Sequence, residues 1–105
     1  MAKGKKMKKK PELVLAAEQG DLDTVNLLLD KKKRGKLEER DGCGDTALNM
    51  AAFKGQVDVV NELVLGRQAN VNTTDERKWT PLISAAYGGH VEVIQVLEFI
   101  CFFFF

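Results

Sequence analysis

The sequence predicts an all-α fold, a solenoid of about three helix–turn–helix units. Two observations predict it. Three segments of the 105-residue chain align on a shared Ala-Ala-x-x-Gly core, and they begin 35 and 34 residues apart. Apolar residues recur at spacings of three and four after each core, which is typical of a helix with one buried face. Self-similarity at this period indicates stacked repeats, because one such unit cannot bury its apolar face alone.

Each unit is expected to open with a short helix whose two ends are marked by residue type. Thr46 and Thr80 are residues that favour N-cap positions, and Pro81 suits the first helical position, where its missing N–H would have no partner. Paired alanines in the middle of each helix permit close helix approach. Gly55 and Gly89 supply the left-handed residue that ends a helix. The sequence therefore predicts helices that begin at these threonines and end at these glycines.

A second helix follows each glycine and is predicted from an apolar stripe on one face. Spacings of three and four residues place the stripe on one side of a helix, where it would be buried. The stripe residues are Leu22, Val25, Leu28 and Leu29 in the first unit, Val57, Val60, Leu63 and Val64 in the second, and Val91, Ile94 and Leu97 in the third.

The third segment, TPLISAAYGGHVEVIQVL, resembles the ankyrin repeat, and the likeness extends over residues 11–97. It is good in DTALNMAAFKGQVDVVNELV and weaker in the first unit, where Pro11 and Glu12 replace a Thr-Pro pair. The resemblance implies an all-α ankyrin-repeat solenoid with short β-hairpin fingers at residues 37–46 and 69–80. In the second finger Lys78 stands where the family usually has glycine, so a positive φ is expected there.

The two ends of the chain fall outside the repeat pattern. The repeats are expected at residues 11–40, 41–74 and 75–97, with an aberrant apolar tail, EFICFFFF, at residues 98–105. Residues 1–10 carry six lysines and are expected to be a basic disordered tail. The candidate targeting residues are Lys5, Lys6, Lys8, Lys9 and Lys10.

The basic tail leaves three functions open: nuclear import, weak attraction to nucleic acid or anionic membrane, and simple solubility. Specific nucleic-acid binding is not expected, because no aromatic residue alternates with the lysines. We expect a cytoplasmic protein, with a nuclear location if the tail acts in import. The net charge is +5 over residues 1–40 and −4 over residues 41–105. Two cysteines, too few for a disulfide framework, favour a reducing compartment.

The apolar C-terminal tail also leaves alternatives open. It could be an anchor or docking peptide, which as an exposed patch would favour self-association. It could instead be a pyrimidine-rich stretch translated past an exon boundary, which would make the chain a truncated and even non-functional product of a longer array. It could also be a genuine end. No apolar run reaches the roughly 18 residues that would span a membrane.

Catalytic chemistry is not expected, because no constellation of reactive residues is present. His90 is the one histidine, too few for a zinc site or a triad. Cys43 has no basic neighbour that would lower the pKa of its thiol. The glycines lack the spacing of a phosphate loop, and the acidic residues of the first finger form a solvated face. The sequence predicts no enzyme, no metal and no cofactor. Those acidic residues are Glu38, Glu39, Asp41 and Asp45.

The resemblance implies protein–protein recognition through a concave face built from finger tips and first helices. Trp79, Phe53 and Tyr87 occupy positions that generally face this groove, and aromatic side chains often dominate interface energies. For Trp79, folding back onto the neighbouring finger is the alternative. The resemblance gives His90 a bridging role between repeats, and gives Asn72 either a finger-stabilising role or hydroxylation. The expected polar rim is Asp45, Lys54, Arg77 and Lys78.

Overall fold

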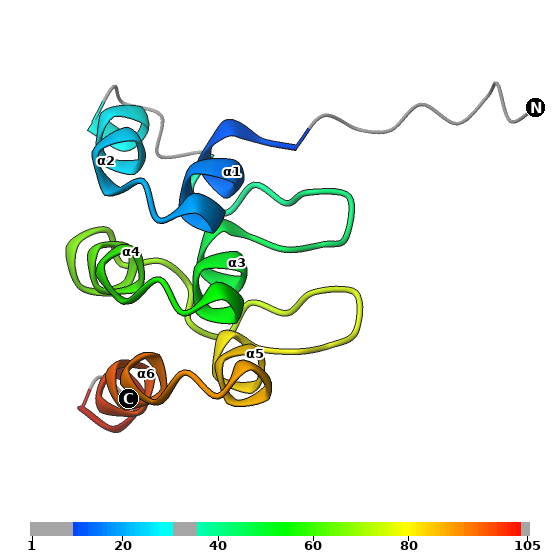
Figure 1. Ribbon diagram of the computed structural model, residues 1–105, viewed down its shortest axis with the longest axis vertical. Coiled ribbons are helices and arrows are strands. Elements are labelled where there is room, and N and C mark those ends of the chain that lie inside the picture. Colours follow the sequence, from blue (N-terminus) through cyan, green and yellow to red (C-terminus); the bar gives the residue numbers. More distant parts are fainter. Residues whose placement is uncertain (1–9, 31–35, 104–105) are drawn as a thin grey trace, which may run out of the picture.

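Three helix pairs stack in one direction, and the second helix of each pair lies behind the first. The computed structural model describes residues 10–30 and 36–103. In Figure 1 the first helices α1, α3 and α5 form one layer, and α2, α4 and α6 form a second. This arrangement confirms the predicted all-α solenoid. The elements are α1 (Glu12–Gln19), α2 (Leu22–Asp30), α3 (Ala47–Lys54), α4 (Val57–Asn61) with the π-helical turn η2 (Glu62–Gly66), α5 (Pro81–Gly88) and α6 (Val91–Phe103).

The helix ends follow the predicted chemistry. The hydroxyls of Thr46 and Thr80 each accept a hydrogen bond from the backbone N–H three residues on, and Pro81 holds the first helical position of α5. Gly55 and Gly89 adopt the left-handed conformation, with φ of 76° and 73°. Local sequence therefore sets where these helices start and stop.

Two loops project from the side of the first helices, where the fingers were expected (Figure 1). Turn hydrogen bonds close them, including Asp41 N–H to the Asp45 carbonyl and Asp75 N–H to the Trp79 carbonyl. Neither loop contains a β-strand within the described residues, so the implied hairpins are present as turn-closed loops. Lys78 has the expected positive φ, 68°.

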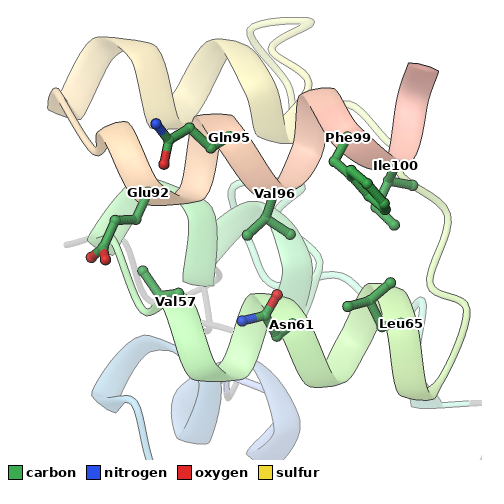
Figure 2. A pocket seen from close by; sticks show the side chains of 8 residues that line it. All are labelled: Val57, Asn61, Leu65, Glu92, Gln95, Val96, Phe99 and Ile100. Atoms are coloured by element: carbon green, nitrogen blue, oxygen red, sulfur yellow. The ribbon is translucent and has the colours of Figure 1, made fainter. Parts of the chain in front are cut away.

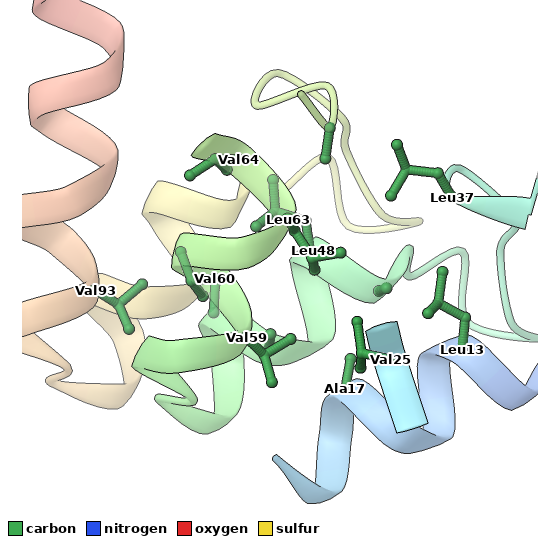
Figure 3. Close-up of a cluster of buried hydrophobic side chains, with 14 of the residues drawn as sticks. Leu13, Ala17, Val25, Leu37, Leu48, Val59, Val60, Leu63, Val64 and Val93 are labelled. Carbon is green, nitrogen blue, oxygen red and sulfur yellow. The ribbon is translucent and has the colours of Figure 1, made fainter. Parts of the chain in front are cut away.

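The side chains between the two helix layers form the core (Figure 3). The stripe prediction holds for Val25, Val60 and Leu97, which are buried, but is wrong for Val91, which is 62% exposed. Val93 is fully buried instead. The error is one of rotation: the buried arc of α6 is set by α4 and α5, and no described element covers the side that carries Val91.

The second repeat absorbs an extra residue without breaking the stack. Its second helix ends in the π-helical turn η2, the usual way in which a helix accommodates one inserted residue. Arg67 follows this turn and donates hydrogen bonds to the carboxylates of Glu62 and Asp30 and to the side chain of Asn26. The guanidinium thus joins η2 to α2 of the preceding repeat.

The apolar C-terminal segment continues α6 as far as Phe103 rather than forming a separate segment after residue 97. Ile100 is buried, while Glu98 is exposed although its equivalent in the second repeat, Val64, is 6% exposed. Phe102 and Phe103 are 79% and 63% exposed. The helix therefore presents an apolar surface at one end of the stack.

A first prediction compares two left-handed glycines. A Cβ at Gly55 would overlap the ring of His90, whereas a Cβ at Gly89 meets nothing. Gly89→Ala should cost about 1–2 kcal/mol of unfolding free energy through backbone strain alone. Gly55→Ala should cost at least ~1 kcal/mol more, because the His90 hydrogen bond is also displaced. Chemical denaturation of both variants measures the difference, and equal losses would contradict the proposed role of His90.

Candidate functional site

Three aromatic rings and two cations gather on the inner face, by which we mean the surface between the finger loops and the helices α1, α3 and α5. The rings of Phe53 and Tyr87 stack with centroids 6.2 Å apart, and Trp79 lies 5.0 Å from Tyr87. The guanidinium of Arg77 lies 3.9 Å above the Trp79 ring, and Lys54 lies 5.7 Å from the Phe53 ring. We call these five residues the aromatic cluster.

Each member of the aromatic cluster is positioned by a different local feature. Phe53 and Lys54 end α3, and Tyr87 occupies the equivalent position in α5. Asp75 positions the finger residues, because its carboxylate accepts hydrogen bonds from the backbone N–H groups of Arg77 and Trp79. Tyr87 is 71% exposed and Trp79 is half-buried, so the cluster is both ordered and accessible.

Asp75 is held as a carboxylate by this network. Burial alone would raise its pKa, but the backbone N–H of Trp79 and the guanidinium and backbone N–H of Arg77 donate to it and lower the pKa overall. A charged Asp75 in turn fixes the Arg77 guanidinium, at 3.0 Å, over the Trp79 ring.

Two of the expected rim residues do not belong to the cluster. Asp45 is only 9% exposed, so its assignment to a solvated rim is wrong. Two fingers pack together around it, which a pattern of scattered acids does not reveal. Lys78 is exposed and stands at the turn of the second finger, with no aromatic contact among the described residues.

The buried Asp45 has an unusual protonation equilibrium. Burial raises its pKa to about 6, with further contributions from the negative charges of Asp41 and Asp75. No described residue donates a hydrogen bond to its carboxylate to offset this. The base of the fingers therefore holds a carboxyl group that titrates near neutral pH.

Arg40 links the two fingers and was not identified from the sequence. Its guanidinium donates to the carbonyl oxygens of Gly44 and Thr74 and to the Thr73 hydroxyl. Two of its acceptors lie more than 30 residues away, so no local pattern could have indicated the contact. The clamp fixes the spacing of the fingers that border the cluster.

The bridging role of His90 is confirmed. Its Nε2 lies 2.9 Å from the Phe53 carbonyl oxygen, in the preceding repeat. Gln56, which the sequence analysis missed, occupies the same repeat position, and its Nε2–H donates to the Glu18 carbonyl oxygen at 2.9 Å. The aligned segments hold the signal that would have found it, because both residues directly follow the left-handed glycine.

The remaining candidate residues stand apart from the cluster. Cys43 is an exposed thiol, as expected, and Asn72 is exposed, with its modification still a prediction. Lys10 is not part of a solvated tail, because its ammonium group lies 2.7 Å from the Glu18 carboxylate, which raises the Lys10 pKa. The candidate targeting residues Lys5, Lys6, Lys8 and Lys9 lie outside the described residues.

A second surface feature lies on the opposite layer, between α4, η2 and α6. Figure 2 shows Val57, Asn61 and Leu65 on one wall of this outer groove and Val96 and Phe99 on the other. Its volume is about 380 Å³. Within residues 10–30 and 36–103, no acidic, histidine or cysteine side chains cluster as metal ligands would, and no helix has the length and apolar character to cross a bilayer.

Comparison with known proteins gives consistent matches. The family model for ankyrin repeats (3 copies) matches residues 13–98. Human ankyrin repeat domain-containing protein 49 is 36% identical over 80 residues, which cover 76% of this chain and 31% of that protein. Serine/threonine-protein kinase 12 of Arabidopsis thaliana is 35% identical over 82% of this chain, and 26S proteasome non-ATPase regulatory subunit 10 of Dictyostelium discoideum is 40% identical over 50% of it. The matches span only 18% and 22% of those two proteins.

A second prediction concerns the pH dependence of stability. The folded-state pKa of Asp45, about 6, exceeds the unfolded value of 3.8, so between these values the folded chain binds more protons and loses stability as pH rises. The loss amounts to at most about 3 kcal/mol. Asp45→Asn should therefore stabilise the chain by about 1–2 kcal/mol above pH 7 and have little effect below pH 4.

Urea denaturation across this pH range measures the effect. Asp58→Asn, at an exposed position of α4, is the control and should leave the pH profile unchanged. A parallel profile for Asp45→Asn and the unaltered chain would contradict the assignment.

Proposed function

We propose that this chain, which belongs to the ankyrin repeat family, binds a partner protein through its inner face, with the aromatic cluster as the anchor. Ankyrin repeats are generally protein–protein interaction modules. The observation that carries the proposal is the 71% exposure of Tyr87 within a set of rings already stacked on Phe53 and Trp79. Large apolar side chains left accessible on an ordered surface are typical of interface hot spots.

The mechanism follows from how the cluster is held. Its residues come from α3, α5 and the second finger, and the Asp75 network and the Arg40 clamp fix that finger before a partner arrives. Little side-chain freedom is then lost on binding, which favours affinity. The paired cations Arg77 and Lys54 present charge beside the rings, so a partner with carboxylates near an apolar anchor would complement the surface.

The proposal includes that the chain acts without catalysis, metal or cofactor. The family is one of interaction modules, although one relative is named a kinase. The polar groups at the inner face are already engaged: Asp75 holds the finger and His90 bridges two repeats. What remains accessible is shape, aromatic surface and charge.

Capture from a cell lysate tests the proposal, and every captured protein is then titrated against purified chain. Trp79→Ala combined with Tyr87→Ala should weaken binding of the specific partner by about 100-fold, as expected for the loss of hot-spot residues. Leu27→Ala, which removes a 54% exposed side chain from α2, is the matched control and should leave binding unchanged. Identical captured sets and affinities for all three proteins would overturn the proposal.

A second function, as a nuclear or nucleic-acid-associated adaptor, is favoured by the six lysines of residues 1–10. On this proposal the protein is cytoplasmic and nuclear. Deletion of residues 1–10 should reduce nuclear accumulation of a fluorescent fusion while partner affinity is retained. Binding of the unaltered chain to nucleic acid with steep salt dependence would favour the adaptor function instead, and an unchanged distribution would exclude import through this segment.

A further inference from the structure

The third repeat presents, uncovered, a face that its neighbours bury. In α1 and α3 the equivalent residues Val14 and Asn49 are fully buried, whereas Ile83 of α5 is 45% exposed. Ala17 and Ala52 are also fully buried, whereas Ala86 is exposed. The difference arises because α3 covers α1 and α5 covers α3, while no described element covers α5.

The second helix of the third repeat shows the same pattern. Val60 of α4 is fully buried, but its equivalent Ile94 is only half-buried, and Val91 is 62% exposed. The left-handed glycines agree: the ring of His90 lies over Gly55, while nothing lies over Gly89. The carbonyl of Tyr87, equivalent to those that accept from Gln56 and His90, receives no side-chain hydrogen bond from the described residues.

We call Ile83, Ala86, Val91, Ile94 and Glu98 the end face. Glu98 stands where the second repeat has the buried Val64, and the carboxylate of Glu98 forms no ion pair within the described residues. The end face is thus a copy of a repeat-docking surface with one acidic group added.

The opposite end of the stack is built differently. Positions that are buried in the second and third repeats carry polar residues in the first. Thr24 stands where Val59 and Val93 are fully buried. Asp21 stands where Gln56 and His90 donate to a preceding carbonyl, and its carboxylate instead accepts from Thr24.

Glu12 adds a third polar substitution at this end. It is exposed where Ala47 and Pro81 are buried. A second copy is therefore a poor occupant of the end face, because its Asp21 cannot donate to the Tyr87 carbonyl and its acids would approach Glu98.

We propose that the end face is a second interaction surface, which takes a helix pair of a partner protein stacked in the register of the repeats. The partner supplies apolar side chains against Ile83 and Val91, an N–H donor for the Tyr87 carbonyl, and a basic residue opposite Glu98. This surface is distinct from the inner face, because it involves the sides of α5 and α6 that point along the stack.

The experiment converts the polar end into a probe of known shape. The full chain with Glu12→Ala, Asp21→Gln and Thr24→Val carries a donor and apolar residues at the positions where the second and third repeats have them. This chain should associate head to tail about 10-fold or more tightly than the unaltered chain, as measured by sedimentation across concentrations. If circular dichroism shows that the triple variant is unfolded, Glu12→Ala with Thr24→Val replaces it.

Ile83→Glu added to the triple variant should abolish this association. Glutamate three residues after the Thr80 cap suits a helix start, so folding is preserved. Leu15→Glu in the unaltered chain is a folding control at a comparably exposed site, 43%. A triple variant that stays monomeric, or association that survives Ile83→Glu, would overturn the proposal. Tight self-association of the unaltered chain that Ile83→Glu removes would overturn it in favour of a second copy as occupant.

Discussion

The stack depends on one contact that recurs at both junctions between repeats. A side-chain N–H from the turn of one repeat reaches the last helical carbonyl region of the repeat before it, at Glu18 in one junction and Phe53 in the other. The left-handed glycine beneath it has no Cβ, so the donor can lie directly against the backbone. Paired alanines let the first helices approach closely enough for that reach. Each requirement is met by a small residue, which is why the repeat tolerates so few changes there.

Since each repeat is completed by its neighbour, the two ends of the stack must be treated separately. The first repeat meets this need by sequence, with Asp21 and Thr24 bonded to each other. The third repeat does not, and Ile83 and Val91 stay accessible. Exposed apolar area of this kind is typical of surfaces that bind other proteins. The difference between the ends therefore carries information about function that the repeated interior lacks.

Features that depend on a few consecutive residues were predictable from the sequence, including the threonine caps and the positive φ of Lys78. The aromatic cluster was also predictable in its membership, because Phe53 and Tyr87 share a repeat position. What failed depends on distant approach. The burial of Asp45 requires two fingers about 30 residues apart to pack together, and the exposure of Val91 depends on which neighbours exist. The sequence pattern contains the period of a helix but not its rotation.

Both binding surfaces converge on α5. Tyr87 faces the fingers from its last turn, and Ile83 and Ala86 point along the stack from the same helix. Only α3 and α6 support α5 within the described residues, so it is the least enclosed of the first helices. A segment with fewer buried contacts opens more readily than the interior of a fold. The contacts that a neighbouring repeat gives to α1 and α3 are thus the contacts that α5 leaves available, and this is where an interaction protein of this architecture can exchange internal packing for binding.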